Sequence, residues 1–143
     1  MQISSRFTIA VHIFACIDTF EKDHKITSDF LADSINVNPV IIRKLLSQLK
    51  NAGLIQVKRG SGGASFARPL EDITLLDIYR AVEGNKPLLH PDTHTNPGCD
   101  VGVDIQLAVR DCFDQVQETA EQEMQNITLQ QILDQYEKRH EQK

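Results

Sequence analysis

The chain has 143 residues, of which 41% are hydrophobic and 24% charged, and its formal net charge is −5. This composition is ordinary for one globular domain with an appendage. No apolar run is long enough to span a bilayer, and the N-terminal segment lacks the basic region and cleavage site of a signal peptide. We therefore expect a cytoplasmic protein with no membrane partner.

Three helices are predicted in the first part of the chain. The first runs from Ser4 or Ser5 to Phe20 and is apolar on so much of its surface that we expect it to be buried on two sides. Thr27 or Ser28 caps a short second helix. A third helix follows, with Asn38 as its N-cap, Pro39 in its first position and Gly53 just past its end.

A glycine-rich hairpin follows the third helix. Residues Leu54 to Lys58 alternate as a half-buried strand, and Ser65 to Ala67 form its partner. The tip between them, GSGGAS, lacks the Lys-Ser/Thr ending of a phosphate-binding loop and precedes a strand, which excludes that motif. Two helices, a tight turn and a β-hairpin predict a winged helix-turn-helix.

The second half of the chain predicts three more helices. Thr74 and Asp77 form a capping box for a helix that ends at Gly84, and the 85–102 segment is a polar loop. A long helix runs from about Val103 to Gln125, and a second capping box opens the last helix. The fold class is thus mainly α with a small β-hairpin wing. We divide it into a winged helix-turn-helix domain (1–84), a mobile loop (85–102) and a part with a dimerisation helix and a C-terminal helix (103–143).

The long helix carries an apolar stripe that needs a cover. Either the final helix of the same chain or a second copy of the protein covers it, and two-fold dimers are the commonest assembly. We expect a homodimer. The interface residues predicted from the stripe are Ile105, Val109, Cys112, Val116 and Ala120.

Positive charge is concentrated around the third helix and the hairpin. No Asp or Glu lies between Ile35 and Leu70, although the segment has six cations, whereas after Arg80 five Lys/Arg face twelve Asp/Glu. Such a surface is typical of a polyanion-binding face, most often for nucleic acid, and a solvated face without acids is the alternative. The predicted partner is therefore double-stranded DNA. The predicted contacts are Asn38, Pro39, Val40, Arg43, Lys44 and Ser47 on the recognition helix; Lys58, Arg59, Gly60, Gly62 and Gly63 in the wing; and Ser4, Ser5 and Arg6 as phosphate anchors.

Four phrases, ISSRFTIAVHI, LLSQLKNAGLI, VKRGSGGASFARP and EDITLLDIYRAVEG, resemble the Rrf2 family of bacterial transcriptional regulators. The resemblance implies a dimeric winged-helix repressor with crossed C-terminal helices and a sensing loop. Iron–sulfur members of the family carry three cysteines in and just after that loop, where this chain has only Cys99, with Cys112 well into the helix. The chain therefore resembles the cluster-free branch, and we expect no cofactor.

Cys99 lies close to the start of the long helix and is a candidate redox sensor, with an inert loop thiol as the alternative. Cys16 and Cys112 lie on apolar stripes and are predicted to be core residues, and His12 is predicted to be a packed histidine. His90, His94 and Cys99 match no strong zinc pattern, so no metal site is expected. No pair of carboxylates and no nucleophile with a nearby base has the spacing of an active site, so the sequence does not indicate an enzyme. The alternatives to DNA binding are a winged-helix protein-interaction module and a thiol or metal sensor without DNA output, and the effector stays open.

Overall fold

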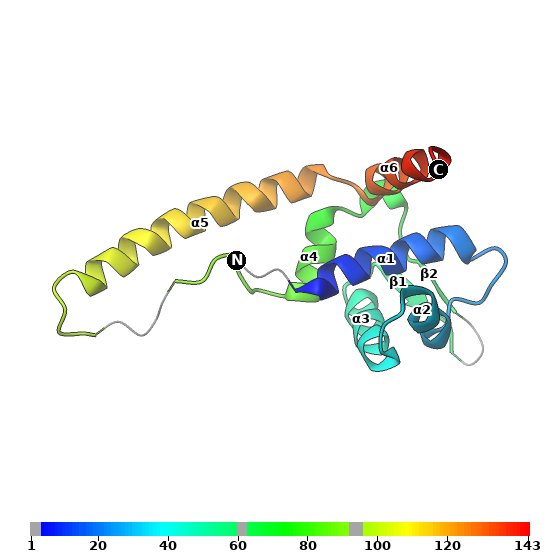
Figure 1. The fold of residues 1–143 in the computed structure, drawn as a ribbon, viewed down its shortest axis with the longest axis horizontal. Coiled ribbons are helices and arrows are strands. Elements are labelled where there is room, and N and C mark those ends of the chain that lie inside the picture. Colours follow the sequence, from blue (N-terminus) through cyan, green and yellow to red (C-terminus); the bar gives the residue numbers. More distant parts are fainter. Residues whose placement is uncertain (1–3, 60–62, 92–95) are drawn as a thin grey trace.

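A computed structural model describes residues 4–59, 63–91 and 96–143 (Figure 1). It is mostly helical with one two-stranded antiparallel sheet, which confirms the predicted fold class. The elements in chain order are α1 (Ser5–Phe20), α2 (Ser28–Ile35), α3 (Pro39–Asn51), β1 (Ile55–Val57), β2 (Ala64–Phe66), a 3₁₀ turn (Leu70–Asp72), α4 (Leu75–Glu83), α5 (Gly102–Asn126) and α6 (Leu129–Glu141).

Side-chain caps begin α1, α2, α3, α4 and α6 where the sequence predicts, whereas α5 has none. The side chains of Ser4, Thr27 and Asn38 accept hydrogen bonds from backbone N–H groups in the first turns of α1, α2 and α3. Both predicted capping boxes are present, at Thr74 and at Thr128. Each such cap satisfies a backbone donor that a helix start leaves unpaired, which stabilises the helix by about 1 kcal/mol.

The core lies between α1, α3 and the hairpin. Phe14 and Ile17 of α1 are fully buried, as is Leu49 of α3. The ring of Phe14 stacks on that of Phe66 from β2, with centroids 5.9 Å apart. Burial of such side chains contributes about 1.5–3 kcal/mol each. The hairpin is thus held against the helices by the same core that packs the helices together.

A second contact fixes the loop end of the hairpin, where β2 begins. The N–H of Ala64 donates to the carbonyl of Ile26 at 2.8 Å, just before α2. A Cβ placed on Gly63 would lie 2.3 Å from the backbone nitrogen of Ile26, so only glycine fits here. The returning strand begins at Ala64, one residue earlier than predicted.

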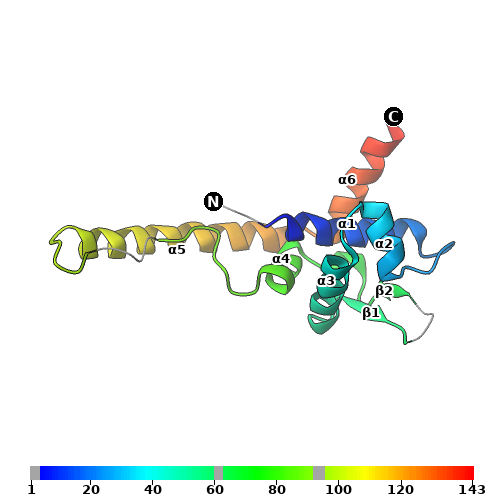
Figure 2. The ribbon, with the colours of Figure 1, turned by 60° about the horizontal axis from the view of Figure 1, so that its bottom comes forward.

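The long helix α5 projects from this body: its N-terminal end lies far from the other helices, and its C-terminal end lies beside them (Figures 1 and 2). Gly102 is its only buried residue. The segment after α5 is tied to the body, because the N–H of Leu75 donates to the carbonyl of Ile127 and the N–H of Leu129 to that of Ile73. Leu129 and Leu133 of α6 then enter the main core. The final helix therefore packs on the N-terminal body and leaves the stripe of α5 uncovered.

Within the described residues, no helix is both long enough and apolar enough to cross a membrane.

Candidate nucleic-acid interface

The helix α3 has one buried and one exposed face. Its buried residues are Ile42, Leu45, Leu46 and Leu49. The opposite face exposes five of the six residues predicted to contact DNA, namely Asn38, Val40, Arg43, Lys44 and Ser47, while Pro39 is half-buried. Val40 is 61% exposed, which leaves its methyl groups free to touch another surface. The face therefore offers hydrogen-bond donors and one apolar contact.

Asn38 has a second task on this face. Its Oδ1 accepts a hydrogen bond from the N–H of Val40 at 2.8 Å. This bond positions the side chain at the start of α3 and leaves its amide NH₂ available as a donor.

The wing residues divide into three groups. Lys58 and Arg59 are exposed beside β1. Gly60 and Gly62 lie outside the described residues. Gly63 lies at the loop end of the hairpin, opposite Lys58 and just before β2, and it is half-buried against Ile26.

The predicted anchors at the start of α1 serve partly as structure. The Oγ of Ser4 accepts a hydrogen bond from the N–H of Arg6 at 3.1 Å, so Ser4 is the helix cap. Ser5 is exposed, and Arg6 is half-buried. The ring of Phe7, one residue further, packs on Tyr79 of α4 with centroids 5.7 Å apart. The start of α1 is therefore positioned by α4.

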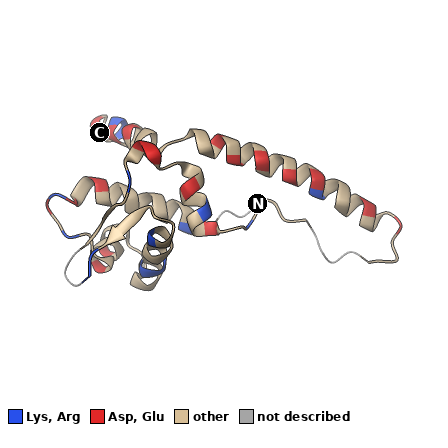
Figure 3. Ribbon diagram, turned by 180° about the vertical axis from the view of Figure 1, so that it is seen from behind, with Lys and Arg blue, Asp and Glu red and all other residues tan. Residues whose placement is uncertain are grey.

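The charges of α3 and α5 are opposite: cations lie on α3, and mostly carboxylates lie along α5 (Figure 3). Arg68 is not part of the exposed cationic face, although it lies in the acid-free segment. Its guanidinium donates to the carbonyls of Ala52 and Gly53 and forms an ion pair with Asp77 at 3.5 Å. Arg68 thus joins the end of α3 to the start of α4.

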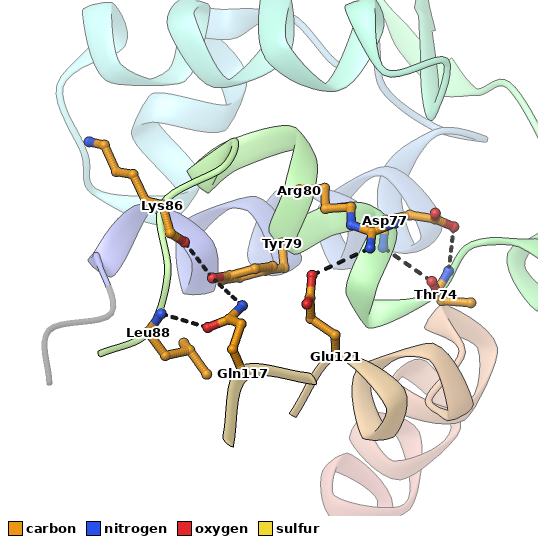
Figure 4. A network of polar contacts seen from close by, with 8 residues as sticks. All are labelled: Thr74, Asp77, Tyr79, Arg80, Lys86, Leu88, Gln117 and Glu121. Carbon is orange, nitrogen blue, oxygen red and sulfur yellow. Dashed lines mark hydrogen bonds and ion pairs between the residues drawn. The ribbon is translucent and has the colours of Figure 1, made fainter. Parts of the chain in front are cut away.

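A polar network ties the loop after α4 to the long helix (Figure 4). The hydroxyl of Tyr79 donates to the carbonyl of Lys86 at 2.6 Å and accepts from Nε2 of Gln117 at 3.3 Å. The Oε1 of Gln117 accepts from the N–H of Leu88 at 2.8 Å. Arg80 and Glu121 form an exposed ion pair beside it at 3.3 Å. We call Tyr79, Lys86, Leu88 and Gln117 the α4–α5 latch. No local pattern in the sequence indicates this network, because Tyr79 and Gln117 are 38 positions apart.

The cysteines and His12 differ from expectation in two cases. Cys16 is buried as predicted, and burial raises the pKa of its thiol. Cys112 is exposed on α5, so its prediction as a core residue is wrong for the single chain. His12 is exposed and not packed, because it lies on the side of α1 that the core does not cover.

Cys99 lies at the entrance to α5. It is exposed, and its Sγ accepts a hydrogen bond from the N–H of Gly102 at 3.3 Å. Its accessibility suits a thiol that reacts with solutes, while the contact places the sulfur at the start of the long helix.

The chain is similar to known transcriptional regulators over most of its length. The family model Rrf2, described as "Iron-dependent Transcriptional regulator", matches residues 3–135. The Bacillus subtilis (strain 168) protein "Putative HTH-type transcriptional regulator YwnA" is 37% identical over 131 residues, which cover 92% of this chain and 96% of that protein. The family consists of transcriptional regulators and not enzymes, as the sequence predicts.

Two solved structures share the fold. A "Crystal structure of a putative DNA binding protein" is 36% identical with a TM-score of 0.72, and the match covers 90% of this chain and 99% of that one. A putative transcriptional regulator from Lactobacillus plantarum gives a TM-score of 0.77 at 24% identity, with 98% of both chains covered.

The iron in the family description does not fit the cysteines of this chain. Cys112 lies ten residues into α5, about 15 Å along the axis from the helix start beside Cys99. Cys16 is buried in α1. In the described part of the chain, no three His, Cys, Asp or Glu residues are grouped to hold a metal ion. His90 is exposed, and His94 lies outside the described residues.

Proposed function

The chain belongs to the Rrf2 family of transcriptional regulators, and from this membership we propose that it binds duplex DNA sequence-specifically in the cytoplasm, as a homodimer that acts as a repressor. The observation that carries the proposal is the exposed face of α3, which combines donors with an apolar contact opposite a fully buried face. An α-helix of this kind fits the major groove of B-DNA.

The roles on this face follow from the side chains. Arg43 suits bidentate donation to O6 and N7 of guanine, and Val40 suits contact with a thymine methyl. Asn38, Lys44 and Ser47 add hydrogen bonds to bases or phosphates. Lys58 and Arg59, with the backbone of Gly60, Gly62 and Gly63, follow the sugar-phosphate backbone or the minor groove. Ser4, Ser5 and Arg6 contact a phosphate at the start of α1.

The uncovered stripe of α5 supports the homodimer. Ile105 is 53% exposed and Val116 is 49% exposed, and Val109 and Ala120 are half-buried beside them. The exposed Cys112 lies on the same stripe. Monomeric proteins rarely leave so long an apolar face in water, and pairing of two such helices about a two-fold axis removes it.

A two-fold dimer determines the form of the DNA site. Two copies of α3 read half-sites that are related by the same axis, so the operator is a near-palindrome with half-sites about 34 Å apart, or a multiple of that distance. A dimer that covers such a site excludes other proteins from it, and this supports the repressor role. The loop before α5, with Cys99 as the redox-sensing residue, is the place where a signal would act.

The proposal is tested by selecting bound sequences from a pool of random duplexes and titrating them at several salt concentrations. We expect enrichment of a near-palindrome and a linear fall of log affinity with log salt. Arg43→Ala should cost about 1–3 kcal/mol and relax preference at one base pair per half-site. Arg59→Ala should weaken binding to all sequences alike. No enrichment together with a flat salt dependence would refute the proposal and favour a protein-interaction module.

A further inference from the structure

A cationic cleft lies beside the recognition face, between α3, the start of α2 and the loop end of β1. It has a volume of about 380 Å³. Its charged lining residues are Arg43 and Lys50 of α3 and Lys58 just after β1. Thr27, Ser28 and Ser47 add hydroxyl groups. The lining contains no Asp or Glu, so its electrostatic potential favours an anion.

The cations of the cleft are available to a ligand. All three side chains are exposed, and none forms an ion pair with another described residue. They differ in this from Arg68, which lies in the same acid-free segment but whose guanidinium donates to two carbonyls and pairs with Asp77. Three unpaired cations that line one cleft give it a positive potential, which attracts an anion.

The start of α2 forms the opposite wall. Ser28 is the first residue of α2, and its N–H has no partner among the described residues. The N–H of Phe30 is already capped by Oγ1 of Thr27 at 3.1 Å. Asp29, the one acid of this first turn, is exposed but does not line the cleft. Free N–H groups at a helix start add a partial positive charge to the cationic wall of α3.

The position of the cleft decides which anion enters it. Arg43 belongs both to the cleft lining and to the exposed face of α3, so the two surfaces are continuous. In a helix-turn-helix complex the first helix, here α2, crosses the DNA backbone while the second lies in the major groove. The cleft between α2 and α3 would then face that backbone, and a phosphodiester there offers a negative charge and acceptor oxygens to the cations and N–H donors of the cleft.

We propose that the cleft between α2, α3 and the wing is a phosphate clamp, in which Lys50, Lys58 and the N–H of Ser28 hold one backbone phosphate of duplex DNA. The clamp rests on the proposed DNA binding and adds Lys50, Thr27 and Ser28 to the interface. It fixes the depth and tilt of α3 without reading sequence, because phosphate contacts position a protein on DNA while base contacts specify the site.

Two matched pairs of variants test the clamp. Lys50→Gln removes one cation of the cleft, and Lys138→Gln removes one from the last turn of α6, which is remote from it. Ser28→Pro removes the N–H at the first helical position, where proline is tolerated, and Ser28→Ala keeps it. The extended backbone of Thr27 (φ −88°, ψ 165°) already suits a residue that precedes proline. Circular dichroism establishes that each variant is folded.

The readout is affinity for the selected operator and for a random duplex at several salt concentrations. We expect Lys50→Gln to weaken both about tenfold and to reduce the salt slope by about one, with no effect of Lys138→Gln. Ser28→Pro should weaken both duplexes relative to Ser28→Ala. Wild-type binding with an unchanged slope in Lys50→Gln would overturn the clamp and leave DNA binding intact. Equal affinity of the two Ser28 variants would overturn the helix-start contact, and a wild type that does not bind DNA would overturn both proposals.

Discussion

The hydroxyl of Tyr79 is the centre of the α4–α5 latch, and its removal tests whether the latch stabilises the fold. Tyr79→Phe keeps the ring, which is 3% exposed and packs on Phe7, but it deletes the bonds to the Lys86 carbonyl and to Gln117. A typical intramolecular hydrogen bond contributes about 0.5–1.5 kcal/mol to stability. Lys86 is exposed, so water replaces part of the loss at its carbonyl. We therefore expect a loss of about 1–2 kcal/mol.

The assay is urea unfolding at one fixed protein concentration, since the stability of a dimer depends on concentration. The matched control is Tyr136→Phe, because Tyr136 is 42% exposed and its only described interaction is stacking on His140. It should change stability by less than about 0.5 kcal/mol. A double-mutant cycle of Tyr79→Phe with Gln117→Ala should give a coupling of about 0.5–1.5 kcal/mol. A change in Tyr79→Phe no larger than in Tyr136→Phe, with no coupling, would refute the reasoning.

Four further predictions concern the dimer, the wing, the thiols and the absence of an iron–sulfur cluster. Val116→Glu places a charge on the exposed stripe of α5, so sedimentation should show monomers that bind the operator weakly; a dimer as stable as wild type would place the interface elsewhere. Gly63→Ala forces a Cβ against the Ile26 backbone, and operator affinity should fall because the wing must shift; unchanged affinity would show that this end of the hairpin moves without cost to binding. A soluble thiol reagent should label the exposed Cys99 faster than Cys16, whose burial also raises its pKa, and mild peroxide should lower operator affinity in wild type but not in Cys99→Ser. Anaerobic treatment with iron and sulfide should leave the protein colourless, and a stable brown protein with stoichiometric iron would contradict this.

Features that depend on neighbours within a few residues were predictable from the sequence. The pair Asn38–Pro39 specifies the start of α3, and Thr74 with Asp77 specifies the start of α4, because a cap is satisfied within its own first turn. Gly53 ends α3 with a positive φ of 75°, which glycine adopts without strain. The exposed face of α3 was predictable for the same reason, since helical periodicity places Arg43 and Lys44 opposite Leu45 and Leu49.

Only the tertiary structure decided how distant segments use their side chains. Arg68 lies 15 residues from Gly53 and Tyr79 lies 38 from Gln117, and no local pattern indicates such pairs. The same holds for the packing of Gly63 on Ile26 and for the cleft that brings Ser28 near Lys50. Periodicity identifies an apolar face but not the surface that covers it. Cys112 lies on an apolar stripe in the sequence and was therefore predicted to be a core residue, but it is exposed in the chain. Which apolar faces enter the core depends on contacts between segments that are far apart in the sequence.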